Sequence, residues 1–569
     1  MRAYPRLLPQ PAIESRTAIS YAIGVGASAM ETEQSLGTKC AGCVGSDRRF
    51  ELTIWGLVLI GAALRLAINV CPVPSLTLDE AAVANRLSEP WSAHAFLYGR
   101  LVHRPVLYVL LCKLLAGFYN VELVLRLSSI LPSIAELVLF VQLAKRLLKS
   151  RLSVLFCVFA IALNPYLINY ARMFKPYALE HAVCVLLMLL FVRWRQDGHG
   201  RSAFLTACLV SAFLAYSTIF LCVPLFLWVA AVSVRGRRYR TAALYLGLLG
   251  TITLLMAFAS WLAHQHVGAA IGPEAHRGLP PTRGPAALVV WFARQSSSLL
   301  TWLTRLPVPL ERTPATKRIH SVFIGLLYGA GLVALCRRRR FAVLLMLTGP
   351  LCLAALAGWF GQWPFRLYRT NLFMISLFVL VAGCGVDVLA RLRRAWPRRI
   401  VYAVLAAYML VHLPWTPSQY RTNAWYLGGF TEIKDAIGCL YEKLRATPGA
   451  GHVVYVNNGG HHAWIYYTQY HKTFFAPYRD FFERHVTVCF QTDREPETVA
   501  RETRAALAEH GDVWFLLHHL FGRSYHAFGV VLNEPGVEWD GTFLTGAQVF
   551  HVRRERTDAQ RDQSAPPRP

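Results

Sequence analysis

Long apolar runs alternate with short polar segments through most of this chain. Eleven of these runs approach the roughly 20 residues that cross a bilayer as a helix. Because an α-helix satisfies its own backbone hydrogen bonds in lipid, the pattern predicts an all-α polytopic membrane domain over 51–416. The runs cover residues 52–70, 123–144, 152–169, 177–192, 203–217, 219–234, 241–262, 319–336, 341–358, 370–390 and 400–416.

One apolar segment, 105–119, is too short to span and predicts a helix lying along the outer face of the membrane domain. Counting it as a span would reverse the loops that follow. The alternative, that it does cross, stays open at this point.

The pattern changes after Pro417. Residues 420–555 favour helices near 430–445 and 497–510, and extended segments near 452–456, 486–490, 512–517 and 543–552. Helices and strands in alternation predict a small, separate soluble α/β domain. Residues 1–50 and 556–569 lack either periodicity, and we expect disordered tails there.

Charge fixes the expected topology. The net charge is +27, yet only 16% of residues are charged and 55% are hydrophobic. The basic residues gather between spans, as short cytoplasmic loops do. With the N-terminus inside, every cluster is cytoplasmic and the α/β domain is outside; this argues for contact with membrane lipid and against nucleic acid. The clusters are 145–151, 193–201, 235–240, 337–340 and 391–399.

The outer side then holds the segments 71–122, 170–176, 263–318 and 362–369. In the first of them, Asp79 and Glu80 form an adjacent carboxylate pair just past the first span. Neighbouring residues on a helix do not share a face, so one carboxylate can face a cavity while the other caps or binds a partner. A purely structural alternative is that Asp79 caps a helix starting near Glu80.

Cationic side chains fall in the same outer segments. Arg172 and Lys175 are predicted to lie on the outer side, although Lys and Arg in short loops favour the cytoplasmic side. This exception indicates an anionic group nearby. The others are His103, Arg104, Arg366 and Arg369. Each alone fits an arginine at a lipid interface. Together with the acidic pair, they predict a lipid phosphate held beside a carboxylate base.

Metal ligands and disulfides stay open. His264 and His266 form a His-x-His pair in the segment 263–318, which could bind a metal or simply be solvated. Cys40 and Cys43 lack further ligands nearby. Cys439 and Cys489 could pair if their domain is outside the cytoplasm.

Three stretches, in this order, resemble a known family. They are Thr77-Leu-Asp-Glu-Ala81, His103-Arg-Pro-Val-Leu-Tyr108 and Glu122-Leu-Val-Leu-Arg126. The segments Asn164-Pro-Tyr166 and Tyr170-Ala-Arg-Met-Phe-Lys-Pro-Tyr177 continue the likeness. The chain resembles GT-C membrane glycosyltransferases of the dolichyl-phosphate-mannose–protein mannosyltransferase and aminoarabinose transferase superfamily. It departs at Thr370, where relatives carry Tyr, and at Arg104, where relatives carry Pro.

The resemblance implies a GT-C-like fold of about 11 to 13 transmembrane helices with the site on the outer, periplasmic face of a bacterial inner membrane. It implies a polyprenyl-phosphate sugar as donor and a lipid, glycan or protein acceptor. It assigns the catalytic pair to Asp79 and Glu80, with Asp79 as the base, and leaves a divalent metal open. A lipid or sugar transporter or flippase, or a polysaccharide ligase or polymerase, are the alternative interpretations.

Overall fold

The computed structural model of the protein describes the chain in fifteen stretches. They are residues 48–70, 75–90, 105–267, 286–287, 290–295, 314–360, 363, 369–392, 395–412, 433–447, 451–473, 478–491, 495–518, 522–544 and 546–554. The expected tails 1–50 and 556–569 lie outside these stretches, except that residues 48–50 open the first helix.

Each predicted span corresponds to a helix or a pair of helices. Six of the described helices are long and apolar enough to cross a membrane, or seven if one bent pair counts as a span. The helices that correspond to the eleven predicted spans are α2 (Arg48–Val70), α6 (Glu122–Leu147), α7 (Arg151–Ala162) with α8 (Pro165–Ala171), α9 (Tyr177–Asp197), α10 (Arg201–Leu214), α11 (Ile219–Arg235), α12 (Tyr239–Val267), α16 (Pro314–Arg337), α17 (Phe341–Trp359), α18 (Met374–Leu389) and α19 (Ala395–His412).

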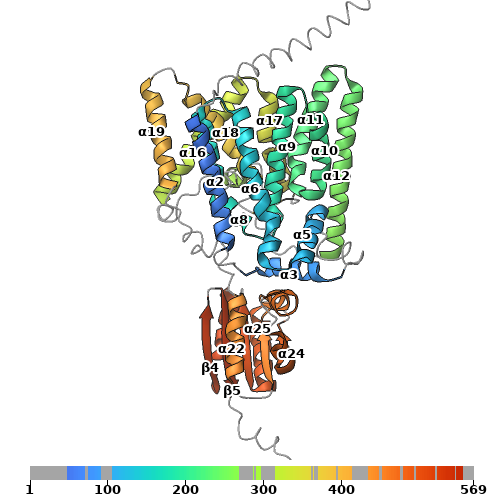
Figure 1. The fold of residues 1–569 in the computed structure, drawn as a ribbon, viewed down its shortest axis with the longest axis vertical. Helices are drawn as coiled ribbons and strands as arrows, with labels where there is room; N and C mark the ends of the chain where they lie inside the picture. Colours follow the sequence, from blue (N-terminus) through green and yellow to red (C-terminus); the bar gives the residue numbers. More distant parts are fainter. Residues whose placement is uncertain are drawn as a thin grey trace, which may run out of the picture.

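These helices stand side by side in one bundle, and a small α/β domain lies beyond one end of it (Figure 1). The basic clusters fall at helix ends and in short connections at the opposite end. One carboxylate, Asp387, joins three of them: it pairs with Arg338 at 3.1 Å and Arg391 at 3.0 Å, and accepts the Ser150 N–H at 2.7 Å. The end of the bundle next to the α/β domain is called the domain end below.

Two expectations about helix bounds need correction. The span 152–169 is broken into α7 and α8, bent by 45°, where Pro165 removes a backbone donor. The segment 263–318 is not a loop throughout, because α12 runs on to Val267 and α16 begins at Pro314. His264 and His266 therefore lie on the last turns of α12, where positions two apart do not share a face. Their side chains lie outside what is described.

The short apolar segment forms helix α5 (Val106–Phe118). It packs beside helix α3 (Leu78–Ser88) at the domain end, as Figure 1 shows. At 13 residues, α5 is shorter than a span requires.

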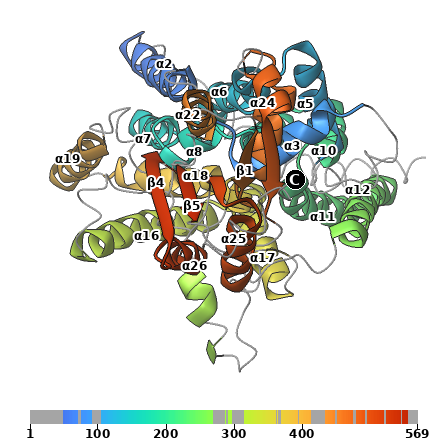
Figure 2. The same cartoon turned by 90° about the horizontal axis from the view of Figure 1, so that it is seen from below.

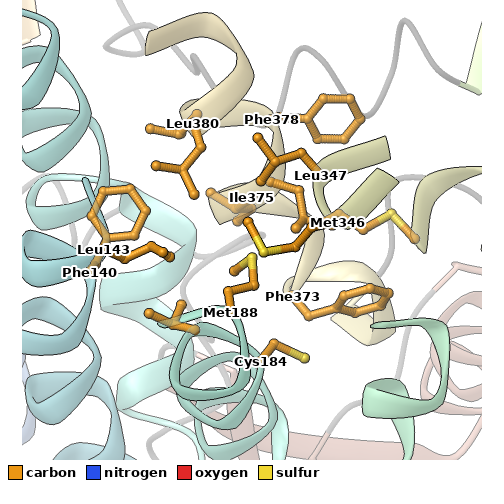
Figure 3. Close-up of a cluster of buried hydrophobic side chains, with 14 of the residues drawn as sticks. Phe140, Leu143, Cys184, Met188, Met346, Leu347, Phe373, Ile375, Phe378 and Leu380 are labelled. Atoms are coloured by element: carbon orange, nitrogen blue, oxygen red, sulfur yellow. The ribbon is translucent and has the colours of Figure 1, made fainter. Parts of the chain in front are cut away.

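The helices pack around a core of large apolar side chains. Figure 3 shows Phe140 of α6, Met188 of α9, Met346 of α17 and Phe378 of α18 converging in this core. Two glycines let α16 and α18 cross closely: a Cβ at Gly331 would overlap the Val381 carbonyl, and one at Gly385 would overlap the Leu327 carbonyl. Small residues at helix crossings are typical of membrane bundles.

The C-terminal domain is built on a five-stranded sheet of order β2-β1-β3-β5-β4. Strands β1 (His452–Val456) and β2 (Val486–Phe490) have the predicted bounds, and β3 (Asp512–His518) follows β1 in parallel. The single strand expected at 543–552 is instead an antiparallel hairpin of β4 (Val537–Leu544) and β5 (Ala547–Arg554). The domain's helices are α22 (Ile433–Ala446), α23 (His461–Ile465), the π-helical turn η3 (Tyr466–Tyr470), α24 (Arg479–His485), α25 (Pro496–His510) and α26 (Gly522–Leu532).

Both faces of this sheet are covered. On β3, the side chains of Val513, Phe515 and Leu517 pack towards α25 and α26. Those of Trp514 and Leu516 pack on the opposite face of the sheet. This second face shares one buried cluster with α22, α23 and η3, and also with Leu76 and Ala84 of the membrane domain. The core of the α/β domain therefore continues into the segment that carries α3.

Viewed from the α/β domain, the sheet lies across the middle of the bundle (Figure 2). The parts of the domain that pack against α3 are α23 and η3. Figure 1 places α3 between the helical bundle and the α/β domain.

Candidate functional site

Helix α3 carries the acidic pair, and its first turn decides which carboxylate does what. The helix begins at Leu78 with Thr77 as N-cap, so Asp79 lies inside the first turn and does not cap it. Glu80 supplies the cap, since its Oε2 accepts the Thr77 N–H at 2.7 Å. A carboxylate in this position satisfies a backbone donor that the helix leaves unpaired.

Glu80 is buried, with 1% of its side chain exposed, and protein donors surround it. Its Oε1 accepts the Phe174 N–H. The Arg126 guanidinium lies 3.8 Å from Oε2 and also donates to the Ser75 carbonyl at 2.8 Å. A buried carboxylate is stable only when paired and hydrogen-bonded. Glu80 therefore ties α3 to α6 and to the segment 172–176.

Asp79 has the opposite environment. Its side chain is 49% exposed, and its Oδ2 lies 2.6 Å from Nζ of Lys175. Only 8% of the Lys175 side chain is exposed. One carboxylate is thus fixed inside the protein while its neighbour is presented to solvent beside a buried ammonium, as the helix geometry predicts.

The backbone around Lys175 is held from several sides. Ser129 donates its hydroxyl to the Lys175 carbonyl at 2.9 Å. Phe174 is fully buried, with its ring centroid 6.5 Å from that of Tyr108 on α5. The segment 172–176 is therefore wedged between α3, α5 and α6, which gives the lysine a defined position.

Helix α3 is held at its other end as well. Lys113 of α5 donates its ammonium protons to the carbonyls of Leu87 and Glu89, where α3 ends. A cation at a helix C-terminus satisfies carbonyls that have no partner within the helix. Since both ends of α3 are fixed, Asp79 stands on a rigid element.

The remaining predicted cations are placed only in part. Arg172 is half-buried at the end of α8, three residues before Lys175. Arg369 lies in the 3-10 turn η2 (Arg369–Asn371), which follows α17 at the domain end, and only its backbone is described. His103, Arg104 and Arg366 lie outside the described residues.

The described residues bear on the expected metal site and disulfide. No group of three or more His, Cys, Asp or Glu side chains gathers within the described parts of the chain. Cys439 and Cys489 are both free thiols.

Sequence reasoning missed a second polar cluster, centred on Glu122 at the start of α6. Glu122 accepts the Tyr467 hydroxyl at 3.0 Å, lies 2.7 Å from Nε2 of His471, and pairs with Lys434 at 3.1 Å. All three partners belong to the α/β domain. No spacing in the sequence joins residue 122 to residues 434–471, so nothing but the tertiary fold could reveal this contact.

Tyr467 is fully buried in this cluster. Removal from water, reinforced by the nearby Glu122 carboxylate, raises the pKa of Tyr467 well above its ordinary value. The hydroxyl therefore keeps its proton and stays a hydrogen-bond donor at neutral pH.

Comparison with known proteins gives only distant similarities. No family of known sequences matches the chain, and no curated protein matches it. Among solved structures, ArnT from Cupriavidus metallidurans bound to undecaprenyl phosphate aligns over 89% of this chain and 98% of its own, with 12% identity and a TM-score of 0.48. ArnT in the apo state aligns over 87% and 98%, with 14% identity and a TM-score of 0.47.

An oligosaccharyltransferase from Archaeoglobus fulgidus, in complex with Zn and sulfate, aligns over 81% of this chain and 67% of its own, with 12% identity and a TM-score of 0.42. At such identities and TM-scores, these similarities describe the overall course of the chain and carry no functional conclusion.

Proposed function

We propose that this protein is a membrane glycosyltransferase that moves a sugar from a polyprenyl-phosphate donor to an acceptor hydroxyl at the outer membrane face. The observation that carries the proposal is the pairing of Asp79 with Lys175 at the domain end of the bundle. An exposed carboxylate and a buried cation, fixed side by side at a membrane surface, are what proton removal beside a lipid phosphate needs. The order of motifs along residues 50–415 supports the same class.

The reaction we propose is one direct displacement. An acceptor oxygen attacks the anomeric carbon of the donor, and a carboxylate oxygen of Asp79 takes the hydroxyl proton. As the new C–O bond forms, the bond between the anomeric carbon and the phosphate oxygen breaks, and its electron pair stays on the phosphate. Attack from the face opposite the leaving group inverts the anomeric centre. Such general-base assistance contributes about 10²- to 10⁴-fold.

Lys175 has two roles in this scheme. In the ligand-free protein it holds Asp79 in place through the 2.6 Å ion pair. When donor binds, its ammonium becomes a contact for the phosphate, whose charge rises as the sugar departs. Arg172 is proposed as a second phosphate contact, and His103, Arg104, Arg366 and Arg369 keep that role as predictions.

Glu80 acts through position. With its oxygens engaged by Thr77, Phe174 and Arg126, it anchors the first turn of α3 and leaves proton transfer to Asp79. This divides the predicted catalytic pair into a base and a positioning residue.

The transporter alternative draws on polar residues inside the spans. The structure pairs two of them: Glu136 of α6 lies 3.1 Å from His181 of α9, and His181 lies 2.7 Å from the Ser376 hydroxyl of α18. Buried contacts of this kind join helices to one another in membranes. We therefore assign these residues to packing.

The test is transfer from radiolabelled polyprenyl-phosphate sugars to crude envelope acceptors by the purified full-length protein, with polyprenyl-diphosphate sugars in parallel. We expect product from the monophosphate donors, and a loss of at least about 100-fold in Asp79→Asn. Asp540→Asn, an exposed acid of the α/β domain, is the control. Transfer only from diphosphate donors favours the ligase alternative, and full activity in a folded Asp79→Asn removes Asp79 from the base role.

A further inference from the structure

The polypeptide that leads into α3 is held by the α/β domain. The backbone N–H of Leu76 donates to the Tyr467 hydroxyl at 2.8 Å, and that hydroxyl donates onward to Glu122 at 3.0 Å. One residue earlier, the Ser75 hydroxyl accepts the backbone N–H of Lys434 at 3.2 Å. Two consecutive residues just before the N-cap of α3 are thus fixed by groups more than 350 positions away in the sequence.

These contacts are buried and connected. Ser75, Leu76 and Tyr467 are each fully buried, and 3% of the His471 side chain is exposed. The Glu122 carboxylate lies within hydrogen-bonding distance of the side chains of Tyr467, His471 and Lys434 at the same time. A fully satisfied buried network of this kind is rigid, because breaking any one bond leaves a polar group without water.

The path from this network to Asp79 is short. Tyr467 fixes Leu76, the next residue Thr77 is the N-cap of α3, and Asp79 lies in the first helical turn. Arg126 strengthens the same path, since it donates to the Ser75 carbonyl and lies beside Glu80. Movement of Leu76 would therefore shift the start of α3 and the carboxylate that the helix presents.

We propose that Tyr467, together with the Glu122 cluster that orients its hydroxyl, is a positioning residue that sets the place of the Asp79 carboxylate, so that the α/β domain forms part of the catalytic apparatus. The part of this inference that concerns catalysis rests on the proposed function. The part that concerns structure, namely that the α/β domain positions α3, rests only on the contacts described above.

The test is Tyr467→Phe in the full-length protein, which removes one hydroxyl and keeps the ring. The matched control is Tyr455→Phe, which removes a hydroxyl bound to Glu502 at 2.6 Å on the other face of the sheet. Hydrogen exchange over residues 75–84 reports the position of α3 without reference to any reaction. Initial rates with varied donor report kcat and KM separately.

We expect faster exchange over 75–84 in Tyr467→Phe and wild-type exchange there in Tyr455→Phe. We expect kcat to fall by about 10- to 100-fold in Tyr467→Phe, as for a small misplacement of a reacting group, with donor KM changed less than about twofold. A role in stability alone would leave kcat per folded molecule unchanged.

Two results overturn the proposal: wild-type exchange over 75–84 in Tyr467→Phe, or faster exchange there with unchanged kcat. If Tyr467→Phe does not fold, Glu122→Gln serves instead, since it keeps an acceptor for the hydroxyl but loses the charge that pairs with Lys434, and the same two readouts decide. If the wild-type protein transfers no sugar from any donor, the proposed function fails, and the exchange measurement still decides whether the domain controls α3.

Discussion

The ammonium of Lys175 lies 2.6 Å from a carboxylate oxygen of Asp79, although 96 positions separate the two residues. The lysine is buried and the aspartate is half exposed, so the pair lies at the boundary between the protein interior and solvent. Next to this pair, the backbone N–H of Phe174 donates to the Glu80 carboxylate, which holds the segment 172–176 against the first turn of α3.

Lys175→Gln tests the cation at this boundary. We expect donor affinity to fall by about tenfold or more, because a charge-assisted contact to phosphate is worth about 1.5 to 3 kcal/mol. Equilibrium binding of a polyprenyl-phosphate to purified protein measures the effect. Lys443→Gln, which removes a partly exposed lysine of the α/β domain paired with Asp540, is the control. Equal affinity in both variants would exclude Lys175 as a phosphate contact.

The two neighbouring carboxylates should differ in their effect on stability. Glu80→Ala leaves Arg126 and two backbone donors without their buried acceptor, and we expect a loss of about 3 to 5 kcal/mol. Asp79→Ala removes a half-exposed carboxylate but leaves the buried Lys175 ammonium with one partner fewer, so we expect a smaller loss, of about 1 to 3 kcal/mol. Thermal unfolding in detergent compares the two variants. The assignment of Glu80 as an anchor is refuted by similar unfolding temperatures for both.

Gly331 and Gly329 provide a matched pair on α16. An added Cβ at Gly331 would overlap the Val381 carbonyl of α18, whereas a Cβ at Gly329 meets nothing within 4 Å. We expect Gly331→Ala to destabilise the bundle by at least about 1 to 3 kcal/mol, as overpacking does. Gly329→Ala should match or slightly exceed the wild type, since alanine favours a helix. Yield of monodisperse protein and its unfolding temperature measure both.

The contribution of Tyr467 to stability should depend on pH. Burial, with Glu122 nearby, raises its pKa well above the ordinary value of 10.0. The unfolded chain therefore releases this proton first, near pH 10. The stability that the buried hydroxyl contributes is fully present below that pH and falls progressively as the pH rises from there towards the raised pKa. The unfolding temperatures of wild type and Tyr467→Phe should differ most near neutral pH and converge towards pH 11. A difference that stays constant over this range contradicts the assignment.

Local patterns were sufficient for the elements themselves. Strands β1 and β2 have the expected bounds, and each expected span is a helix or a bent pair, because apolar periodicity and turn residues act over neighbouring positions. The separate faces of Asp79 and Glu80 also follow from helix geometry alone. The break at Pro165 and the hairpin of β4 and β5 were missed, since apolar runs on either side of a short turn look continuous.

What the sequence determined by itself is the class of the molecule: a bundle of apolar helices, a basic end, an α/β domain, and an acidic pair next to the first span. The tertiary structure decided which partner each of these groups meets. Lys175 joins Asp79, Arg126 joins Glu80, and Tyr467 joins Leu76. The physical reason is that periodicity and helix caps are short-range properties of the chain, whereas an ion pair or a buried hydrogen bond depends on where distant segments are packed together.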